Sequence, residues 1–235
     1  MKMQEMVEEI RECRLFQNMS DEEILLFIKQ NPCKIICYRN GDCVISKDED
    51  PTGIGIILEG SVGIYTDSFY GDHTLIGIGD SDYLFGFIAT FYNQSNSITT
   101  LYCRKHCRIA YFQVAPADNA VSFIARTSPK LLSNIFHMLT KHIRDDFDRM
   151  HIISTNSVRT KIVRYILYRH SCTQALSFDL LYNRTELASF LGIYRTSLSH
   201  ELLNMKKQGL IQYTRNTLFI TDLNALIAIE CESYE

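Results

Sequence analysis

The sequence predicts an α+β protein: an N-terminal antiparallel β-roll of the jelly-roll type, then a long helix, then a C-terminal winged helix-turn-helix. Three observations lead to this fold class. Short β-rich runs separated by turn residues fill residues 33–112. Residues 130–155 contain no glycine or proline and carry apolar side chains at helical spacing. Residues 183–220 follow the order helix, glycine turn, helix and hairpin.

These patterns divide the 235 residues into three parts. We expect an effector-sensing β-roll with a helical lead-in over residues 1–128 and a dimerisation helix over residues 129–155. The winged helix-turn-helix is expected over residues 156–235.

The composition is that of an ordinary globular protein, with 46% hydrophobic and 22% charged residues. Disordered, collagen-like and purely coiled-coil chains are therefore excluded. Residues 1–13 alternate charged and apolar side chains, unlike a signal peptide, and no segment has the ~18 apolar residues that span a bilayer. The eight cysteines of an unexported chain are expected to be reduced thiols. We therefore expect a cytoplasmic protein with no membrane partner.

Residues 3–29 form the expected helical lead-in. Ser20 or Asp21 is the candidate N-cap, and Glu23 completes a capping box ahead of an apolar run. Turns are expected in the β region because glycine and asparagine tolerate positive φ. They lie at Asn40-Gly41-Asp42, Glu59-Gly60 and Tyr70-Gly71-Asp72.

The long helix expected over residues 130–155 is about 39 Å long at ~1.5 Å per residue. Its apolar stripe fits either a core helix packed on its own β domain or the seam between two copies. A narrow stripe sustained over this length favours helix pairing, so we expect a dimer seam, interrupted at Asp146. The seam residues are Leu132, Ile135, Leu139, Ile143, Met150 and Ile153.

The C-terminal cassette begins with a capping-box pair, Asn183 and Glu186. A short helix follows and ends at Gly192, a residue suited to the left-handed conformation. A second helix starts near Arg195 and stops at Gly209, and two short β runs follow. This order is that of a winged helix-turn-helix.

The outer face of the second helix is rich in hydrogen-bond donors and nearly free of carboxylates. This pattern predicts DNA binding, since the second helix of such a motif enters the major groove. Arg195 is expected to bridge guanine O6 and N7. The other expected contacts are Thr196, Ser199 and His200 on the same helix, Arg184 and Thr185 at the phosphate-facing start of the first helix, and Arg215 at the hairpin tip.

The stretch RTELASFLGIYRTSLSHEL resembles the DNA-binding domain, or reader, of the CRP/FNR superfamily of bacterial transcription regulators. The likeness extends over residues 15–226. The resemblance implies a homodimer that binds double-stranded promoter DNA and works with RNA polymerase. Arg195 matches the guanine-reading arginine of the family. Thr196, His200 and Glu201 depart from the family pattern, so the operator need not be the common one.

Cyclic-nucleotide-binding members of this family carry Gly-Glu and then Arg-Ser in the β-roll, where they hold the ribose and the cyclic phosphate. This chain has Gly86-Phe87 and then Ser95, Asn96 and Ser97. A buried phosphate without a cation loses charge-assisted hydrogen bonds worth roughly 1.5–3 kcal/mol each. We therefore do not expect cAMP binding by these residues. The candidate pocket takes a less charged small-molecule effector or none.

Cysteines of the β domain offer an alternative, a redox- or metal-responsive regulator. Cys103 and Cys107 are expected on one strand face, but the chain has no CxxC pair, so no iron–sulfur motif is evident. The histidines form no HxH pair, and no clear haem motif is evident either. A jelly-roll metalloenzyme is a further alternative. It would need converging histidine and carboxylate ligands, which the sequence does not suggest, so we expect neither a metal site nor an enzyme.

The net charge of −3 hides an asymmetry. Residues 1–155 carry 15 basic and 20 acidic side chains, whereas residues 156–221 carry 9 basic and 3 acidic ones. An overall acidic chain argues against a nucleic-acid binder. The basic segment coincides with the predicted reader, so the average charge is misleading.

Overall fold

The computed structural model describes residues 3–47, 49, 53–67, 73–92, 99–113, 124–125 and 128–233. Its contacts divide the chain into two compact units, Met1–His142 and Ile143–Glu235. Among the described residues, no helix is both long enough and apolar enough to cross a membrane.

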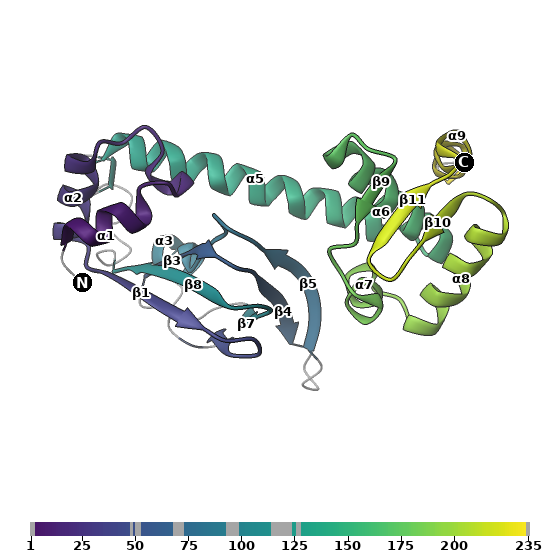
Figure 1. The fold of residues 1–235 in the computed structure, drawn as a ribbon, viewed down its shortest axis with the longest axis horizontal. Helices are drawn as coiled ribbons and strands as arrows, with labels where there is room; N and C mark the ends of the chain where they lie inside the picture. Colours follow the sequence, from purple (N-terminus) through teal and green to yellow (C-terminus); the bar gives the residue numbers. More distant parts are fainter. Residues whose placement is uncertain are drawn as a thin grey trace. The chain divides into compact units, whose positions relative to one another are not determined.

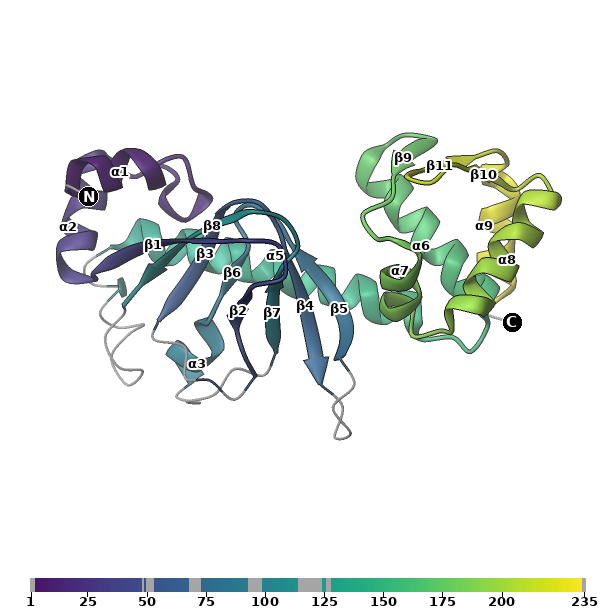
Figure 2. The ribbon, with the colours of Figure 1, turned by 60° about the horizontal axis from the view of Figure 1, so that its bottom comes forward.

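The first unit begins with the helical lead-in: α1 (Met3–Ile10), a 3-10 turn (Arg14–Phe16) and α2 (Asp21–Gln30). The predicted capping box is present, since the Ser20 side chain accepts from the Glu23 N–H and the Glu23 carboxylate accepts from the Ser20 N–H. Both helices lie at one end of the β-roll (Figures 1 and 2).

The described strands form two four-stranded antiparallel sheets, in the orders β1-β8-β3-β6 and β2-β7-β4-β5. Figure 2 shows the strands of the roll curving past one another. Their bounds are β1 Cys33–Tyr38, β2 Cys43–Ile45, β3 Ile54–Glu59, β4 Val62–Asp67, β5 His73–Gly79, β6 Leu84–Phe85, β7 Thr100–Cys103 and β8 Cys107–Phe112. A short helix, α3 (Phe87–Tyr92), follows β6.

The sheet that contains β3 is covered on both faces. Ile56 and Ile57 are neighbours on β3 and therefore point to opposite faces, yet both are fully buried. Ile56 packs with the lead-in helices, whereas Ile57 packs with Val62 and Ile109 between the two sheets. The roll therefore has two apolar clusters, one inside it and one under the helices.

Glycine is required at the β3–β4 turn. Gly60 has a φ of +93°, and a Cβ there would lie 2.2 Å from the carbonyl oxygen of His106. The predicted turn at Asn40-Gly41-Asp42 is also present, with a φ of +89° at Gly41. The predicted turn at Tyr70-Gly71-Asp72 lies outside the described residues.

The long helix α5 spans Pro129–Ile153. Its structure corrects our prediction that one apolar stripe forms the dimer seam. Three members of the predicted seam, Leu132, Ile135 and Leu139, pack against the helix-side cluster of the first unit. Ile143 and Met150 are 54% and 59% exposed, and Ile153 is half-buried. Helical periodicity groups residues by face, but it does not say whether a face meets its own domain or another molecule.

A different set of apolar side chains is exposed on α5. Phe136 and Phe147 are 66% and 64% exposed and join Ile143 and Met150. With Thr140 between them, these positions follow the alternating spacing of four and three residues that defines a heptad seam.

The second unit contains α6 (Val158–Thr173), α7 (Arg184–Leu191), α8 (Arg195–Lys207) and α9 (Leu223–Glu232). The described residues also form a three-stranded sheet in the order β10-β11-β9, from Ile211–Tyr213, Thr217–Ile220 and Ser177–Asp179. The predicted hairpin is confirmed. The sequence patterns missed β9 and α9, because β9 has three residues and α9 follows the hairpin almost directly.

Candidate DNA-binding surface and effector pocket

The helix-turn-helix is built as the local sequence signals predict. The Asn183 side chain accepts the N–H groups of Thr185 and Glu186, both at 3.0 Å, and Glu186 returns a bond to the Asn183 N–H. Gly192 ends α7 in the left-handed conformation, with a φ of 61°. The chain then turns directly into α8.

Three side chains hold α8 in the second unit. Leu198, Leu202 and Met205 are at most 1% exposed and occupy one face of the helix. The opposite face is therefore left to solvent. It presents Arg195, Thr196, Ser199 and His200, all exposed as predicted.

An ion pair fixes α8 against α6. Arg159 Nε lies 2.5 Å from Glu201 Oε1, and these side chains are 33% and 16% exposed. The Asn204 amide adds contacts to Glu201 and to the His200 ring, the latter at 3.3 Å. Glu201 departs from the family pattern, and its carboxylate is paired with Arg159. The sequence reasoning missed this pair, since no local signal links residues 42 positions apart.

The predicted role of Arg184 needs a correction. Its guanidinium is half-buried and lies 4.5 Å from the centre of the Tyr213 ring on β10, and burial lowers its pKa. Lys206 approaches the same ring at 5.3 Å. Arg184 therefore does not project freely from α7; it joins α7 to the wing.

The start of α7 also differs from the expected phosphate site. The N–H group of Thr185 is already bonded to Asn183, although the Thr185 side chain is exposed. At α8, Tyr194 stands at the N-cap, and within the described part of the chain it gives the helix no side-chain cap. Arg215 lies at the exposed tip of the β10–β11 hairpin, as predicted.

The structure describes two of the predicted effector residues, Gly86 and Phe87. Gly86 has a φ of +77° and connects β6 to α3, which Phe87 begins. The Phe87 ring lies 6.1 Å from the His142 ring of α5. Phe87 supplies no carboxylate for a ribose, so this position does not fit the family's cyclic-nucleotide site. Ser95, Asn96 and Ser97 lie outside the described residues.

His142 is a half-buried histidine of α5. Its ring stacks on Tyr83 with centroids 4.6 Å apart and planes 23° apart. Burial, and to a lesser degree Lys141, lowers the pKa of His142 from 6.5 to about 4. The ring is therefore neutral at neutral pH.

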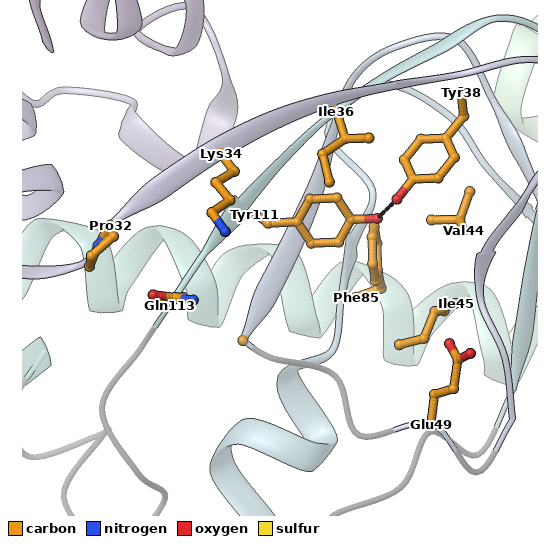
Figure 3. Close-up of a pocket in the computed structure, with 11 residues that line it drawn as sticks. Pro32, Lys34, Ile36, Tyr38, Val44, Ile45, Glu49, Phe85, Tyr111 and Gln113 are labelled. Atoms are coloured by element: carbon orange, nitrogen blue, oxygen red, sulfur yellow. Dashed lines mark hydrogen bonds between the residues drawn. The ribbon is translucent and has the colours of Figure 1, made fainter. Parts of the chain in front are cut away.

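A cavity of about 270 Å³ lies along β1, β2, β6 and β8 (Figure 3). The hydroxyl groups of Tyr38 and Tyr111 meet there at 2.8 Å, and burial raises the pKa of Tyr111. Figure 3 shows Lys34 to one side of the tyrosine pair and Glu49 to the other. The apolar wall consists of Ile36, Val44, Ile45 and Phe85. Among the described residues, this cavity is not lined by Gly86 or Phe87, so it differs from the pocket we predicted.

The cysteine pair also needs a correction. Cys103 ends β7 and Cys107 begins β8, so the two residues lie on different strands in different sheets. Their sulfur atoms are 3.1 Å apart, and both residues are buried. Burial raises the pKa of Cys103 to about 12, which disfavours the reactive thiolate. Within the described ranges, no group of three or more metal-ligating side chains occurs.

Comparison with known proteins agrees with this architecture. Residues 35–120 match the cyclic nucleotide-binding domain, and residues 160–229 match the Crp-like helix-turn-helix domain. Together, the β-roll and the basic helix-turn-helix define a two-part transcription regulator that binds DNA. The chain belongs to the CRP/FNR superfamily.

Individual relatives are distant. The chain is 22% identical over 189 residues to electron transport regulator A of Shewanella oneidensis, covering 77% of this chain and 73% of that protein. The c-di-GMP responsive global regulator CLP of Xanthomonas campestris has the same fold, with a TM-score of 0.67 and 19% identity over 86% of this chain and all of that one. A CooA variant from Carboxydothermus hydrogenoformans gives a TM-score of 0.68 and 16% identity over 91% of this chain and 92% of that one.

Proposed function

We propose that this protein is a homodimeric, sequence-specific regulator whose promoter binding is modulated by an effector at the β-roll. The observation that carries the proposal is the division of α8 into a buried apolar face and an exposed polar face. The polar face holds Arg195, Thr196, Ser199 and His200, which offer donors and acceptors to base edges. We infer a DNA-binding regulator with no enzymatic activity, which works in the cytoplasm with RNA polymerase.

Each DNA contact has a proposed role. Arg195 reads guanine, and Thr196, Ser199 and His200 read neighbouring base edges. Thr185 and Arg215 contact the sugar-phosphate backbone of the DNA. Arg184 acts through the wing, because its stacking on Tyr213 supports the hairpin that carries Arg215.

The homodimer is supported by α5. Phe136, Ile143, Phe147 and Met150 form an exposed apolar stripe on one helix, and a second copy of the same helix would bury it. We keep the domain limits of 1–128 for the sensor, 129–155 for the dimerisation helix and 156–235 for the reader.

The effector site is supported by the cavity in the roll. Its apolar wall, its tyrosine pair and Lys34 suit a small amphipathic molecule better than a cyclic nucleotide. Such a ligand acts only if it binds the DNA-competent arrangement more tightly than the other. Native mass spectrometry of the anaerobically purified protein would detect a retained ligand directly.

A redox-responsive form of this function is the second candidate. The short distance between the Cys103 and Cys107 sulfurs favours it, whereas their burial opposes it. If peroxide treatment changes promoter binding in the wild type but not in Cys103→Ser, the thiol pair is the sensor.

The central experiment is a salt-titrated selection of DNA fragments by the full-length protein. We expect a two-fold symmetric consensus, and an affinity that falls steeply with salt. If no sequence is enriched over competitor DNA, the proposed function is wrong.

A further inference from the structure

Leu203 is an apolar residue on the otherwise polar face of α8. Its side chain is 44% exposed, although Leu202 beside it is 1% exposed and Leu198 is fully buried. Residues three, four and seven positions apart share a helix face. Leu203 follows Ser199 by four positions and Thr196 by seven, so it extends the proposed base-reading face by one turn.

The surroundings of Leu203 suit a polyanion rather than an apolar protein partner. Arg195, Lys206 and Lys207 are exposed on the same helix. The one carboxylate of α8, at Glu201, is paired with Arg159. A leucine within this basic and polar surface is therefore expected to contact the same partner as Arg195, the DNA.

An exposed leucine in a DNA groove needs an apolar feature of the DNA. In the major groove, the thymine C5-methyl group is the apolar feature that differs between base pairs. Polar side chains at this position would instead seek base-edge donors and acceptors.

We propose that Leu203 reads a thymine methyl group in each half-site of the operator. The inference rests on the proposed function of α8. Leu203 lies eight residues beyond Arg195, which is about 12 Å along the helix axis. At 3.4 Å per base pair, the thymine is expected within about four base pairs of the pair read by Arg195.

The test uses the full-length protein and the half-site obtained by selection. Each thymine is replaced in turn by deoxyuridine, which differs only by the missing methyl group. At one thymine per half-site, we expect this replacement to weaken wild-type binding about fourfold, the contribution of one buried methyl group. Leu203→Ala is expected to bind the normal site with the same loss and to be insensitive to deoxyuridine at that position.

Ile227→Ala is the matched control, since Ile227 is also 44% exposed but lies on α9. It is expected to keep the full deoxyuridine penalty, as is Arg195→Ala at whatever affinity it retains. Unchanged affinity of Leu203→Ala for random DNA establishes that the variant is folded.

Two results overturn the inference: no thymine shows a methyl dependence, or the dependence persists in Leu203→Ala. Either result leaves the proposed function intact, because a half-site has then been selected. If no half-site is enriched, the proposed function fails as well.

Discussion

The helices α5 and α8 each bury one face in the protein and expose the other, but the exposed faces differ in chemistry. On α5 the exposed surface includes a stripe of large apolar side chains, among them Phe136 and Phe147. On α8 they are mainly donors and cations, including Arg195 and His200. An apolar face is stabilised by a second apolar helix, whereas a polar, basic face suits DNA. We therefore propose that the outward residues direct α5 to a second copy of the chain and α8 to DNA.

The strongest way to break this comparison is to make the α5 face polar. Phe147→Glu is expected to abolish the dimer and to weaken binding to a two-half-site operator by about 10²-fold, because the second half-site no longer binds intramolecularly. Sedimentation and DNA binding measure the two effects. Lys141→Glu adds acidic charge away from the stripe and is expected to keep the dimer. A dimer that survives Phe147→Glu would contradict the assignment of this face.

The α8 face is tested by removing its leading cation. Arg195→Ala is expected to lose about 1–3 kcal/mol of binding free energy and to relax the base preference at one position. Arg215→Ala is expected to keep the preference and to reduce the salt slope by about 1. Competition binding over a series of salt concentrations separates the two. An unchanged base preference in Arg195→Ala would remove its reading role.

The attachment of α8 to α6 is tested through its ion pair. Glu201→Gln is expected to lower the free energy of unfolding by about 1–2 kcal/mol, since a charged hydrogen bond to Arg159 is lost. The double variant Arg159→Glu with Glu201→Arg is expected to lose less stability than the sum of the losses in its two single variants. Urea denaturation measures all of these variants. Strictly additive losses would show that the two residues are not coupled.

The smallest effect concerns His142, a half-buried residue of α5 that stacks on Tyr83. Its pKa is about 4 in the folded protein, below the ordinary 6.5, so the unfolded chain binds more protons between these values. Its contribution to stability is therefore present above pH 6.5 and lost as the pH falls toward 4. His142→Gln is expected to show a weaker pH dependence of the urea midpoint over this range. An equal dependence in both proteins would assign it to other groups.

Much of the fold follows from local signals. The Ser20 and Asn183 caps, the left-handed Gly192 and the apolar positions of α8 act within one or two helical turns, so a sequence pattern contains them. The sequence patterns did not predict strand β9, because a three-residue strand has almost no periodicity of its own. They also did not predict helix α9, which follows the hairpin almost directly.

The site residues divide in the same way. Arg195, Thr196, Ser199 and His200 face outward because Leu198, Leu202 and Met205 face inward, and that alternation is written in the sequence. Three other features cannot be predicted from a sequence pattern: the pairing of Arg159 with Glu201, the stacking of Arg184 on Tyr213 and the cavity built from four strands. They join positions far apart in the chain.

The sequence by itself determined the fold class, the order of the main elements and the outward polar face of α8. Only the tertiary structure decided that Ile135 packs inward while Phe147 stays exposed, and that Leu203 is left within a polar surface. The physical reason is that helical periodicity fixes which side chains share a face. Which faces are buried depends on the elements that pack against them, and those elements come from distant parts of the chain.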